Sequence, residues 1–259
     1  MASLLEAKHI TKEYDGRVII RDISIHLEQG ELVSLLGLSG SGKTTLFHVL
    51  SGLTRPEEGE VLLHGREITG RPGAVSYMQQ KDLLFAHKKV IDNVSLPLVL
   101  RGMNKKEARK KANDLFEEFG LEGTQYQYPS QLSGGMRQRA AFLRTYLSSF
   151  HSAYTGSGEM SHGVALLDEP FSALDTITKS QIHTWYLDMM QKIDLSTIFI
   201  THDIDEAILL SDRIYLMTGT PGVIDNEIAV RQGRTARAGF TLTQEFLDYK
   251  REIIRILED

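Results

Sequence analysis

Apolar and polar positions along this chain alternate in two different periods, which predict strands and helices in turn. Residues 23–27 alternate apolar and polar side chains, which is typical of a half-buried strand, and residues 31–37 form the apolar run of a buried strand. The same patterns predict further short strands at 59–68, 74–79, 163–170 and 196–203.

Helical spacing separates these predicted strands. In residues 104–121, Asn104 can cap a helix and five apolar residues from Ala108 to Phe119 share one face. From Ile182 to Ile193 aromatic and methionine side chains recur at helical spacing, which indicates a core face rather than a cofactor site. Other helices are predicted at 45–53, at 134–147, and near the C-terminus with Phe246, Ile253 and Leu257 on one side.

Alternating strands and helices predict an α/β fold with a mainly parallel central sheet and antiparallel strands near the N-terminus. Ligands of such sheets bind beyond the carboxyl ends of the strands. The motifs of interest should therefore lie where predicted strands end.

Composition narrows the chemistry. The chain has 259 residues, 41% of them hydrophobic, which suffices for one large domain or two small ones. It contains no cysteine, which excludes disulfides, thiolate metal sites and cysteine nucleophiles. A net charge of -5 gives no general reason to expect nucleic acid binding. The N-terminal residues lack a secretory pattern, and no apolar run approaches the ~20 residues of a membrane span.

The segment GLSGSGKTT follows the buried strand 31–37 and precedes the helix 45–53. Its glycines allow successive amide N–H groups to turn toward phosphate oxygens, Lys43 can supply charge to the β- and γ-phosphates, and Thr44 can offer a hydroxyl to Mg²⁺. A flexible turn with an incidental lysine is the alternative, which the flanking strand and helix disfavour. The predicted nucleotide-binding residues here are Gly37, Leu38, Ser39, Gly40, Ser41, Gly42, Lys43, Thr44 and Thr45.

A second candidate is VALLDEP, in which four apolar residues are followed by two acids. Asp168 could hold Mg²⁺ through water, and Glu169 could polarise a water that attacks the γ-phosphate. Alone, acids at the end of a strand more often begin a loop. Together with the glycine-rich segment, they predict a site for a nucleoside triphosphate.

The segment LSGGMRQR adds a second anion site. Ser133, Gly134 and Gly135 stand at the start of a predicted helix, where free amides and the positive end of the helix dipole point outward. This segment resembles the LSGGQ signature of the ATP-binding-cassette ATPases, with Met136 in place of the glutamine. The ordered set of motifs extends the resemblance over nearly the whole chain.

The resemblance implies one cassette domain over residues 1–259, a P-loop NTPase fold, and a helical signature subdomain at about 82–145. It implies ATP and Mg²⁺ as cofactors and ATP hydrolysis as the reaction. Two copies would pair head to tail, each signature facing the glycine-rich loop of the other copy. The partners would be separate transmembrane permease subunits and, indirectly, an extracytoplasmic solute-binding protein, and the location would be the cytoplasmic face of a bacterial membrane.

Other family residues match by position. Tyr14 resembles the aromatic residue that stacks on adenine, an interaction of roughly 1–3 kcal/mol. Gln80 resembles the glutamine that senses Mg²⁺ and water, with Gln79 as the alternative. The segment 172–175 resembles the loop that crosses the dimer interface, and His202 resembles the histidine that contacts the γ-phosphate. The resemblance thus implies catalytic residues Glu169, His202 and Gln80, and metal ligands Thr44, Gln80 and Asp168.

One segment departs from the family. Residues 148–163 are rich in Ser and Gly, have no periodicity, and add about a dozen residues before the strand that ends in Asp168. We expect an inserted loop at the amino edge of the sheet, away from the phosphates. His151 and His162 flank it, and a surface loop is expected there rather than a metal, effector or partner site.

Three features point to a subgroup of importers. The order Ile91-Asp92-Asn93-Val94, the LSGGMRQR variant and a late Pro-Gly turn at 219–224 resemble carriers of nitrate, sulfonate, taurine, bicarbonate and thiamine-precursor pyrimidines. The resemblance implies uptake of a small anionic or thiamine-precursor-like solute. Two alternatives stay open: a cassette ATPase acting on a soluble partner in cofactor assembly or cell division, and a small P-loop kinase, which the signature disfavours.

Overall fold

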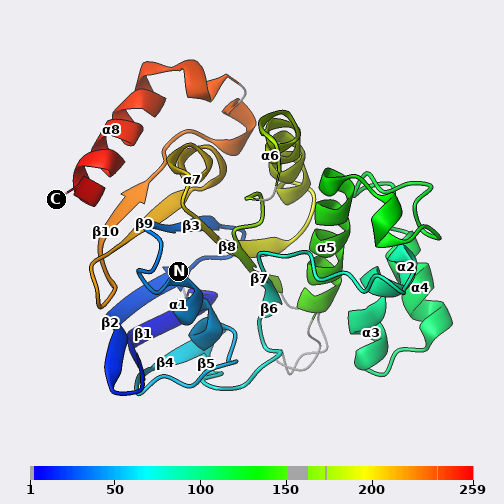
Figure 1. Ribbon diagram of the computed structural model, residues 1–259, viewed down its shortest axis with the longest axis horizontal. Coiled ribbons are helices and arrows are strands. Elements are labelled where there is room, and N and C mark those ends of the chain that lie inside the picture. Colours follow the sequence, from blue (N-terminus) through cyan, green and yellow to red (C-terminus); the bar gives the residue numbers. More distant parts are fainter. Residues whose placement is uncertain (1–2, 151–162, 173, 238, 259) are drawn as a thin grey trace. The chain divides into compact units, whose positions relative to one another are not determined.

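The computed structural model describes residues 3–150, 163–172, 174–237 and 239–258 of the chain (Figure 1). The chain forms two compact units. The first unit contains residues 1–75, 166–169 and 196–259, and the second contains residues 76–165 and 170–195. Most of the predicted insertion, with His151 and His162, lies outside the described residues.

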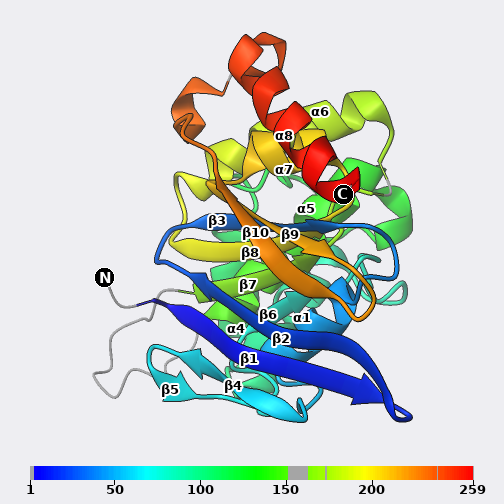
Figure 2. The ribbon, with the colours of Figure 1, turned by 90° about the vertical axis from the view of Figure 1, so that its left-hand side faces the viewer.

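The first unit contains an antiparallel sheet in the order β2-β1-β4-β5 (Figure 2). A long hairpin of β1 and β2 forms much of this sheet. The strand predicted at 23–27 is only the second half of β2. The strand predicted at 59–68 is split in two, because His64 and Gly65 adopt positive φ of 50° and 70° and reverse the chain. The strands are β1 (Leu5–Tyr14), β2 (Arg17–Leu27), β4 (Glu58–Leu63) and β5 (Arg66–Glu67).

The part of the second sheet that lies in this unit runs in the order β10-β9-β3-β8-β7, with residues 166–168 of β7 in the unit. β3 pairs in parallel with both β8 and β9, and β10 returns antiparallel to β9 after the late Pro-Gly turn. Every residue of β3 and β8 is buried, as expected for strands covered on both faces. The strands are β3 (Leu32–Gly37), β7 (Gly163–Asp168), β8 (Leu195–Thr201), β9 (Arg213–Thr218) and β10 (Val223–Ala229).

Two helices cover this sheet, and buried apolar side chains of the helices and strands form one cluster. α7 (Ile204–Leu210) contacts β3, and α8 (Gln244–Glu258) contacts both α7 and β9. α1 (Lys43–Leu50) lies against β1 and β2 instead. Burial of Phe246 and Ile253 in α8 confirms its predicted apolar face. The buried cluster consists of Leu36, Ala207, Ile208, Ile214, Leu216, Ile228, Val230, Phe240, Phe246 and Ile253.

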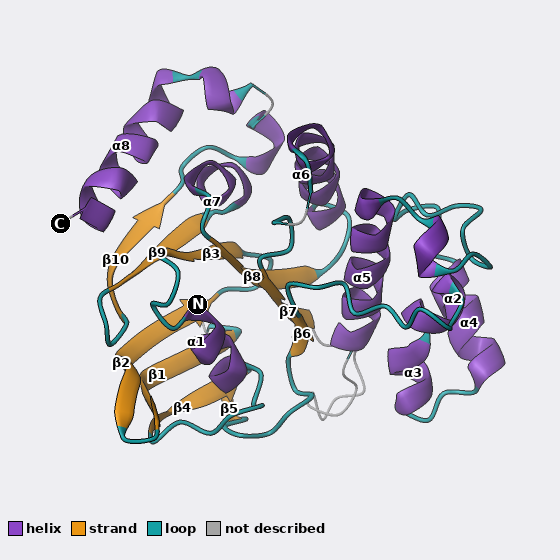
Figure 3. Ribbon diagram, in the orientation of Figure 1, coloured by secondary structure: helices purple, strands orange, loops and turns teal. Residues whose placement is uncertain are grey.

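The second unit is mainly helical (Figure 3). Trp185 of α6 packs edge to face with Phe119 and with Phe142 of α5, with ring centroids 6.0 and 5.8 Å apart. Tyr186 of α6 also packs edge to face with Phe142, at 5.3 Å. The methionine and aromatic stripe of α6 is therefore core, as predicted. The elements are β6 (Ser76–Met78), α2 (Val90–Val94), α3 (Leu96–Leu100), α4 (Lys105–Asn113), α5 (Gly134–Ser149) and α6 (Thr176–Met190).

Two predicted helices differ from the structure by more than three residues at one end. The helix predicted over 104–121 ends at Asn113, because residues 114–120 form turns that close at Gly120 with a φ of 65° and bury Phe116 and Phe119. The helix predicted from Ile182 begins at Thr176, because the Asp175 carboxylate caps it by accepting from the N–H groups of Ile177 and Thr178. In each case a local cap or turn overrode the apolar period.

Among the described residues, no helix combines the length and the apolar character needed to cross a bilayer.

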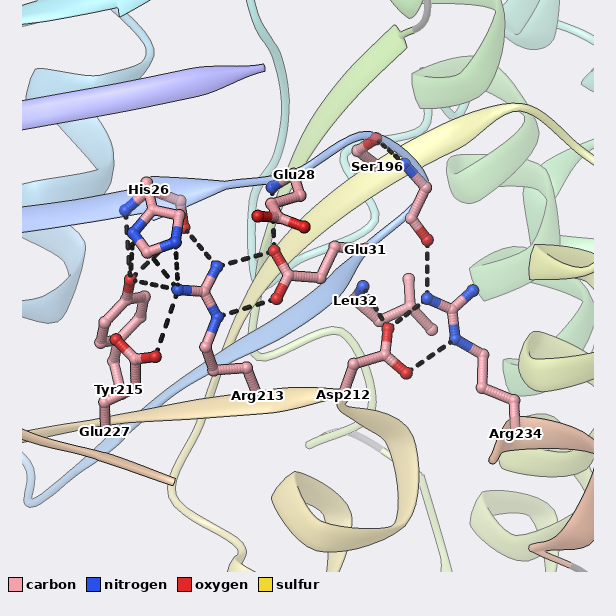
Figure 4. Close-up of polar contacts among 11 residues, drawn as sticks. His26, Glu28, Glu31, Leu32, Ser196, Asp212, Arg213, Tyr215, Glu227 and Arg234 are labelled. Atoms are coloured by element: carbon pink, nitrogen blue, oxygen red, sulfur yellow. Dashed lines mark hydrogen bonds and ion pairs between the residues drawn. The ribbon is translucent and has the colours of Figure 1, made fainter. Parts of the chain in front are cut away.

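Arg213 joins the two sheets of the first unit (Figure 4). Its side chain is 7% exposed, and its guanidinium donates to both carboxylate oxygens of Glu31, at 2.8 and 2.7 Å. It also donates to the His26 carbonyl at 3.0 Å and the Tyr215 hydroxyl at 2.9 Å. Burial raises the pKa of Tyr215 to about 12. Since His26 belongs to β2 and Arg213 begins β9, one cation holds both sheets.

Replacing Arg213 by methionine should lower the free energy of unfolding by about 3 kcal/mol, because Glu31 would stay largely buried without its cation. Chemical denaturation followed by circular dichroism measures this loss. Glu227→Gln is the matched control: that carboxylate is 46% exposed and lies 3.4 Å from Arg213, so a change below about 1 kcal/mol is expected. Equal stability of the Arg213 variant and the wild type would contradict the role of this ion pair.

Candidate functional site

The glycine-rich loop connects β3 to α1. Gly42 is the N-cap of α1 and has a φ of 100°, where an L side chain would be strained. A Cβ atom there would also lie 2.5 Å from the Ile20 side chain of β2. The first turn of α1 carries no acid, so the positive end of its dipole is not offset by its own side chains. The loop and helix end together form a site suited to an anion.

Lys43 begins this helix and is only 7% exposed. Its ammonium donates to the carbonyls of Gly37 at 2.8 Å and Leu38 at 2.7 Å, inside the curve of the loop. Burial lowers the pKa of Lys43, while the charges of Glu169 and Asp168 act to raise it. A partly desolvated ammonium attracts a phosphate more strongly than a lysine in bulk water does.

Thr44 and Asp168 form the pair that could hold a cation. The Thr44 hydroxyl donates to the Asp168 carboxylate at 3.3 Å, and Asp168 is 7% exposed at the end of β7. Among the described residues no group of three or more His, Asp or Glu side chains could hold a metal by itself. A hydroxyl and one carboxylate fit Mg²⁺, which keeps waters and takes phosphate oxygens as its other ligands.

Glu169 and His202 meet where β7 and β8 end. Glu169 has a φ of 45°, a strained conformation for this residue type, and its N–H donates to the Ile200 carbonyl at 3.1 Å. The strained turn directs its carboxylate to 3.2 Å from His202 Nδ1. A carboxylate beside an imidazole can accept a proton from water.

Tyr14 lies at the end of the β1–β2 hairpin and is 42% exposed. The Lys12 ammonium lies 4.9 Å from the centre of its ring. Lys12 pairs across the hairpin with Ile20, the residue that packs against Gly42. The aromatic candidate is therefore on the same hairpin that supports the glycine-rich loop.

The signature residues lie in the second unit at the start of α5. Ser133 caps the helix by accepting from the Met136 N–H at 3.2 Å, and Gly134 and Gly135 form the first turn. That turn also lacks an acid. Ser133, both glycines, Asp175 and Thr178 are among the residues that line one pocket of about 290 Å³. Ala173, in the segment 172–175, lies outside the described residues.

Gln80 is exposed, and its amide lies 3.5 Å from the Ser172 hydroxyl in the same unit. Gln79 is also exposed. The contact of Gln80 with Ser172 does not identify the metal-sensing glutamine, so the choice of Gln80 over Gln79 stays a prediction.

Two further residues of α5 were missed in the sequence. Gln138 is 8% exposed and donates to the carbonyl of Pro170, the residue after Glu169. Arg144 donates to the carbonyls of Asp82 at 2.6 Å and Leu83 at 2.8 Å, and burial lowers the pKa of its guanidinium. Arg137, seven residues before Arg144 and on the same face of α5, forms an ion pair with Asp82 at 3.4 Å. The seven-residue spacing of these two arginines is the feature of the sequence that could have pointed to them.

Replacing Arg144 by methionine should make the segment that follows Gln80 more mobile. The two hydrogen bonds that the guanidinium donates to the carbonyls of Asp82 and Leu83 would be lost. We expect faster amide hydrogen exchange at Leu84 and Phe85 with unchanged helical content by circular dichroism. Lys105→Met, which changes an exposed cation of α4 in the same unit, is the control. Unchanged exchange at both amides in the Arg144 variant would show that this arginine does not hold the segment.

Comparison with known proteins gives a consistent result. The family model described as ABC transporter matches residues 20–152. The chain is 42% identical over 203 residues to the formylaminopyrimidine import ATP-binding protein ThiZ of Halalkalibacterium halodurans, covering 78% of this chain and 74% of ThiZ. It is 36% identical to the nitrate import ATP-binding protein NrtD of Synechocystis, with 87% and 82% covered, and 33% identical to the taurine import ATP-binding protein TauB of Escherichia coli K12, with 91% and 88% covered.

Solved structures share the fold. The chain matches the dimeric post-hydrolysis state of the ATP-binding cassette MJ0796, bound to ADP and phosphate, with a TM-score of 0.70 and 26% identity over 88% of this chain and 100% of that one. It matches cbiO1 of Clostridium perfringens with a TM-score of 0.76 at 23% identity, over 98% of this chain and 100% of that one.

Proposed function

This chain belongs to the ABC transporter family of ATP-binding proteins, and from that membership we propose that it is the ATP-hydrolysing subunit of an importer. ThiZ, NrtD and TauB are each named as import ATP-binding proteins. Those names favour import over the alternative of a cassette ATPase that serves a soluble partner.

The meeting of five side chains at the carboxyl ends of β3, β7 and β8 carries the proposal. Lys43 and Thr44 follow β3, Asp168 ends β7, and Glu169 with His202 closes the site. All belong to one compact unit. This is the edge at which ligands of parallel sheets bind.

The reaction we propose is hydrolysis of ATP by water. The loop amides and the Lys43 ammonium bind the β- and γ-phosphates and counter charge that moves onto the leaving oxygen. Glu169 accepts a hydrogen bond from the attacking water, and His202, 3.2 Å from that carboxylate, orients it and contacts the γ-phosphate. Tyr14 stacks on the adenine.

Mg²⁺ fits the Thr44 hydroxyl and the Asp168 carboxylate, with Gln80 as a further proposed ligand. When bound, the metal neutralises charge on the phosphate oxygens. The protein contributes the orientation of these side chains through α1 and β7.

Under this proposal, the signature residues of one copy of the chain act on the nucleotide that a second copy binds. A triphosphate bound on the loop of one copy would meet Ser133, Gly134 and Gly135 of the other, with segment 172–175 crossing between them. The dimeric cassette MJ0796 supports such pairing. The cassette would span residues 1–259, with a helical signature subdomain at about 82–145.

Permease subunits would supply the membrane path, with a solute-binding protein outside the membrane and this chain on the cytoplasmic face. The cargo we propose is a small anion or a thiamine-precursor-like pyrimidine. The names of NrtD, TauB and ThiZ support those two classes.

Glu169→Gln should slow ATP hydrolysis about 10²- to 10⁴-fold, because the amide cannot accept the proton of water. Phosphate release measures the rate, and gel filtration with ATP and Mg²⁺ should show an accumulated dimer. Glu67→Gln, which changes an exposed carboxylate of β5, is the control. Turnover equal to the wild type would remove Glu169 from the role of base.

Lys43→Ala should weaken ATP binding, since the buried ammonium of the loop is lost. Titration with a fluorescent ATP analogue measures the dissociation constant. Lys250→Ala in α8 is the control, because that cation pairs with Asp205 at 2.7 Å outside the loop. An affinity that survives the Lys43 change undiminished would refute the loop as the phosphate site.

A further inference from the structure

The turn between β9 and β10, residues 219–222, packs directly against the phosphate loop. A Cβ atom at Gly222 would lie 2.0 Å from the Ser41 carbonyl oxygen and 2.7 Å from the Met217 side chain. Such distances are impossible for a real side chain, so only glycine permits this approach. The turn backbone and the loop backbone are therefore in contact at Ser41.

The same turn is hydrogen-bonded to β2. The Gly222 N–H donates to the Ile19 carbonyl at 2.8 Å, and the Arg21 N–H donates to the Gly222 carbonyl at 3.0 Å. These bonds form an isolated parallel bridge between Ile20 and Gly222. The turn is thus attached to a strand of the antiparallel sheet and does not hang free from its own hairpin.

β2 also supports the loop. Ile20 and Ile19 are the side chains that a Cβ atom at Gly42 would meet, at 2.5 and 3.3 Å. The backbone at Ser41 and Gly42 is consequently confined by the turn at one residue and by β2 at the next. Ile20 is fully buried and links both contacts.

The Ser41 side chain does little to fix this position. Its hydroxyl is buried and makes no hydrogen bond within the described residues. Ser41 also lines a pocket of about 470 Å³ together with Leu38, Ser39 and residues 218–220 of the turn. Because space adjoins the loop there, close backbone packing is what can keep it in place.

We propose that the β9–β10 turn sets the position of the phosphate loop, with Gly222 as the positioning residue, so that nucleotide affinity depends on a segment outside the nucleotide motifs. This inference rests on the proposed function, because it concerns the same loop and the same ATP. A side chain at 222 would push Ser41 away and displace the amides and Lys43 that follow it. Glu169 and His202, on β7 and β8, would keep their geometry.

Gly222→Ala should therefore raise the dissociation constant and KM for ATP by about tenfold or more, while kcat at saturating ATP changes less than about threefold. Titration with the fluorescent ATP analogue and steady-state phosphate release give the two quantities. Gly233→Ala is the matched control, since Gly233 has a φ of -61° and nothing lies within 4 Å of its Cβ position.

Loss of stability alone must be separated from loss of positioning. Arg213→Met destabilises the same unit without touching the loop, so at a temperature where it is folded it should bind ATP like the wild type. If Gly222→Ala does not fold, Thr220→Gly loosens the turn without adding bulk and should weaken ATP binding about threefold.

Unchanged affinity in folded Gly222→Ala, or in Thr220→Gly if the former cannot be obtained, would overturn the inference. So would equal losses in Gly222→Ala and Arg213→Met. If the wild-type chain itself failed to bind ATP, the proposed function would fall instead, so the two failures are distinguishable.

Discussion

Close packing around the backbone of residues 38–42 is the constraint on which the rest of the first unit depends. A loop that wraps phosphate must present its N–H groups in a fixed curve, yet its residues are small and form few side-chain bonds. The structure supplies rigidity from outside, through Ile20 at Gly42 and through Gly222 at Ser41. Glycine serves here both as a flexible residue and as one that lets neighbouring backbones come close.

This packing shows what the antiparallel sheet contributes to the candidate site. Its hairpin carries Tyr14 at one end and supports the loop through Ile20, and Arg213 anchors its far part to β3 and β9 through His26 and Glu31. The contacts of Ile20 with the loop lie toward Tyr14, and the Arg213 anchor lies at the opposite end of the hairpin. A buried cation bound by both oxygens of a carboxylate is well suited to such fixing, because its geometry is directional.

Chemistry at the ends of β7 and β8 depends on strain that the sheet can maintain. Glu169 at a φ of 45° would relax in a free peptide, but its N–H is bonded to β8 and its carboxylate meets His202. In the second unit α5 combines several functions. Its first turn presents Ser133 and two glycines, its middle holds the carbonyl of Pro170, and Arg144 holds the segment after Gln80.

By itself the sequence determined the α/β class, the order of the motifs and the residues of the candidate site, because glycines before a lysine and acids after an apolar run are local patterns with local reasons. It also predicted the antiparallel start and the parallel sheet. It misplaced the end of the helix at Asn113 and the start of the helix at Thr176, since turns and caps there compete with a continuous apolar period.

Only the tertiary structure decided which distant segments support those motifs. Gly222 and Arg144 belong to none of the nucleotide-binding motifs. Gly222 lies in a turn that meets Ser41, and Arg144 donates to the carbonyls of Asp82 and Leu83. The spacing of Arg137 and Arg144 marks a shared face of α5, but no spacing along the chain identifies the partners of these residues. The partners depend on which strands become neighbours and on how closely two backbones approach. Residues far apart in sequence thereby fix the geometry that local motifs only make possible.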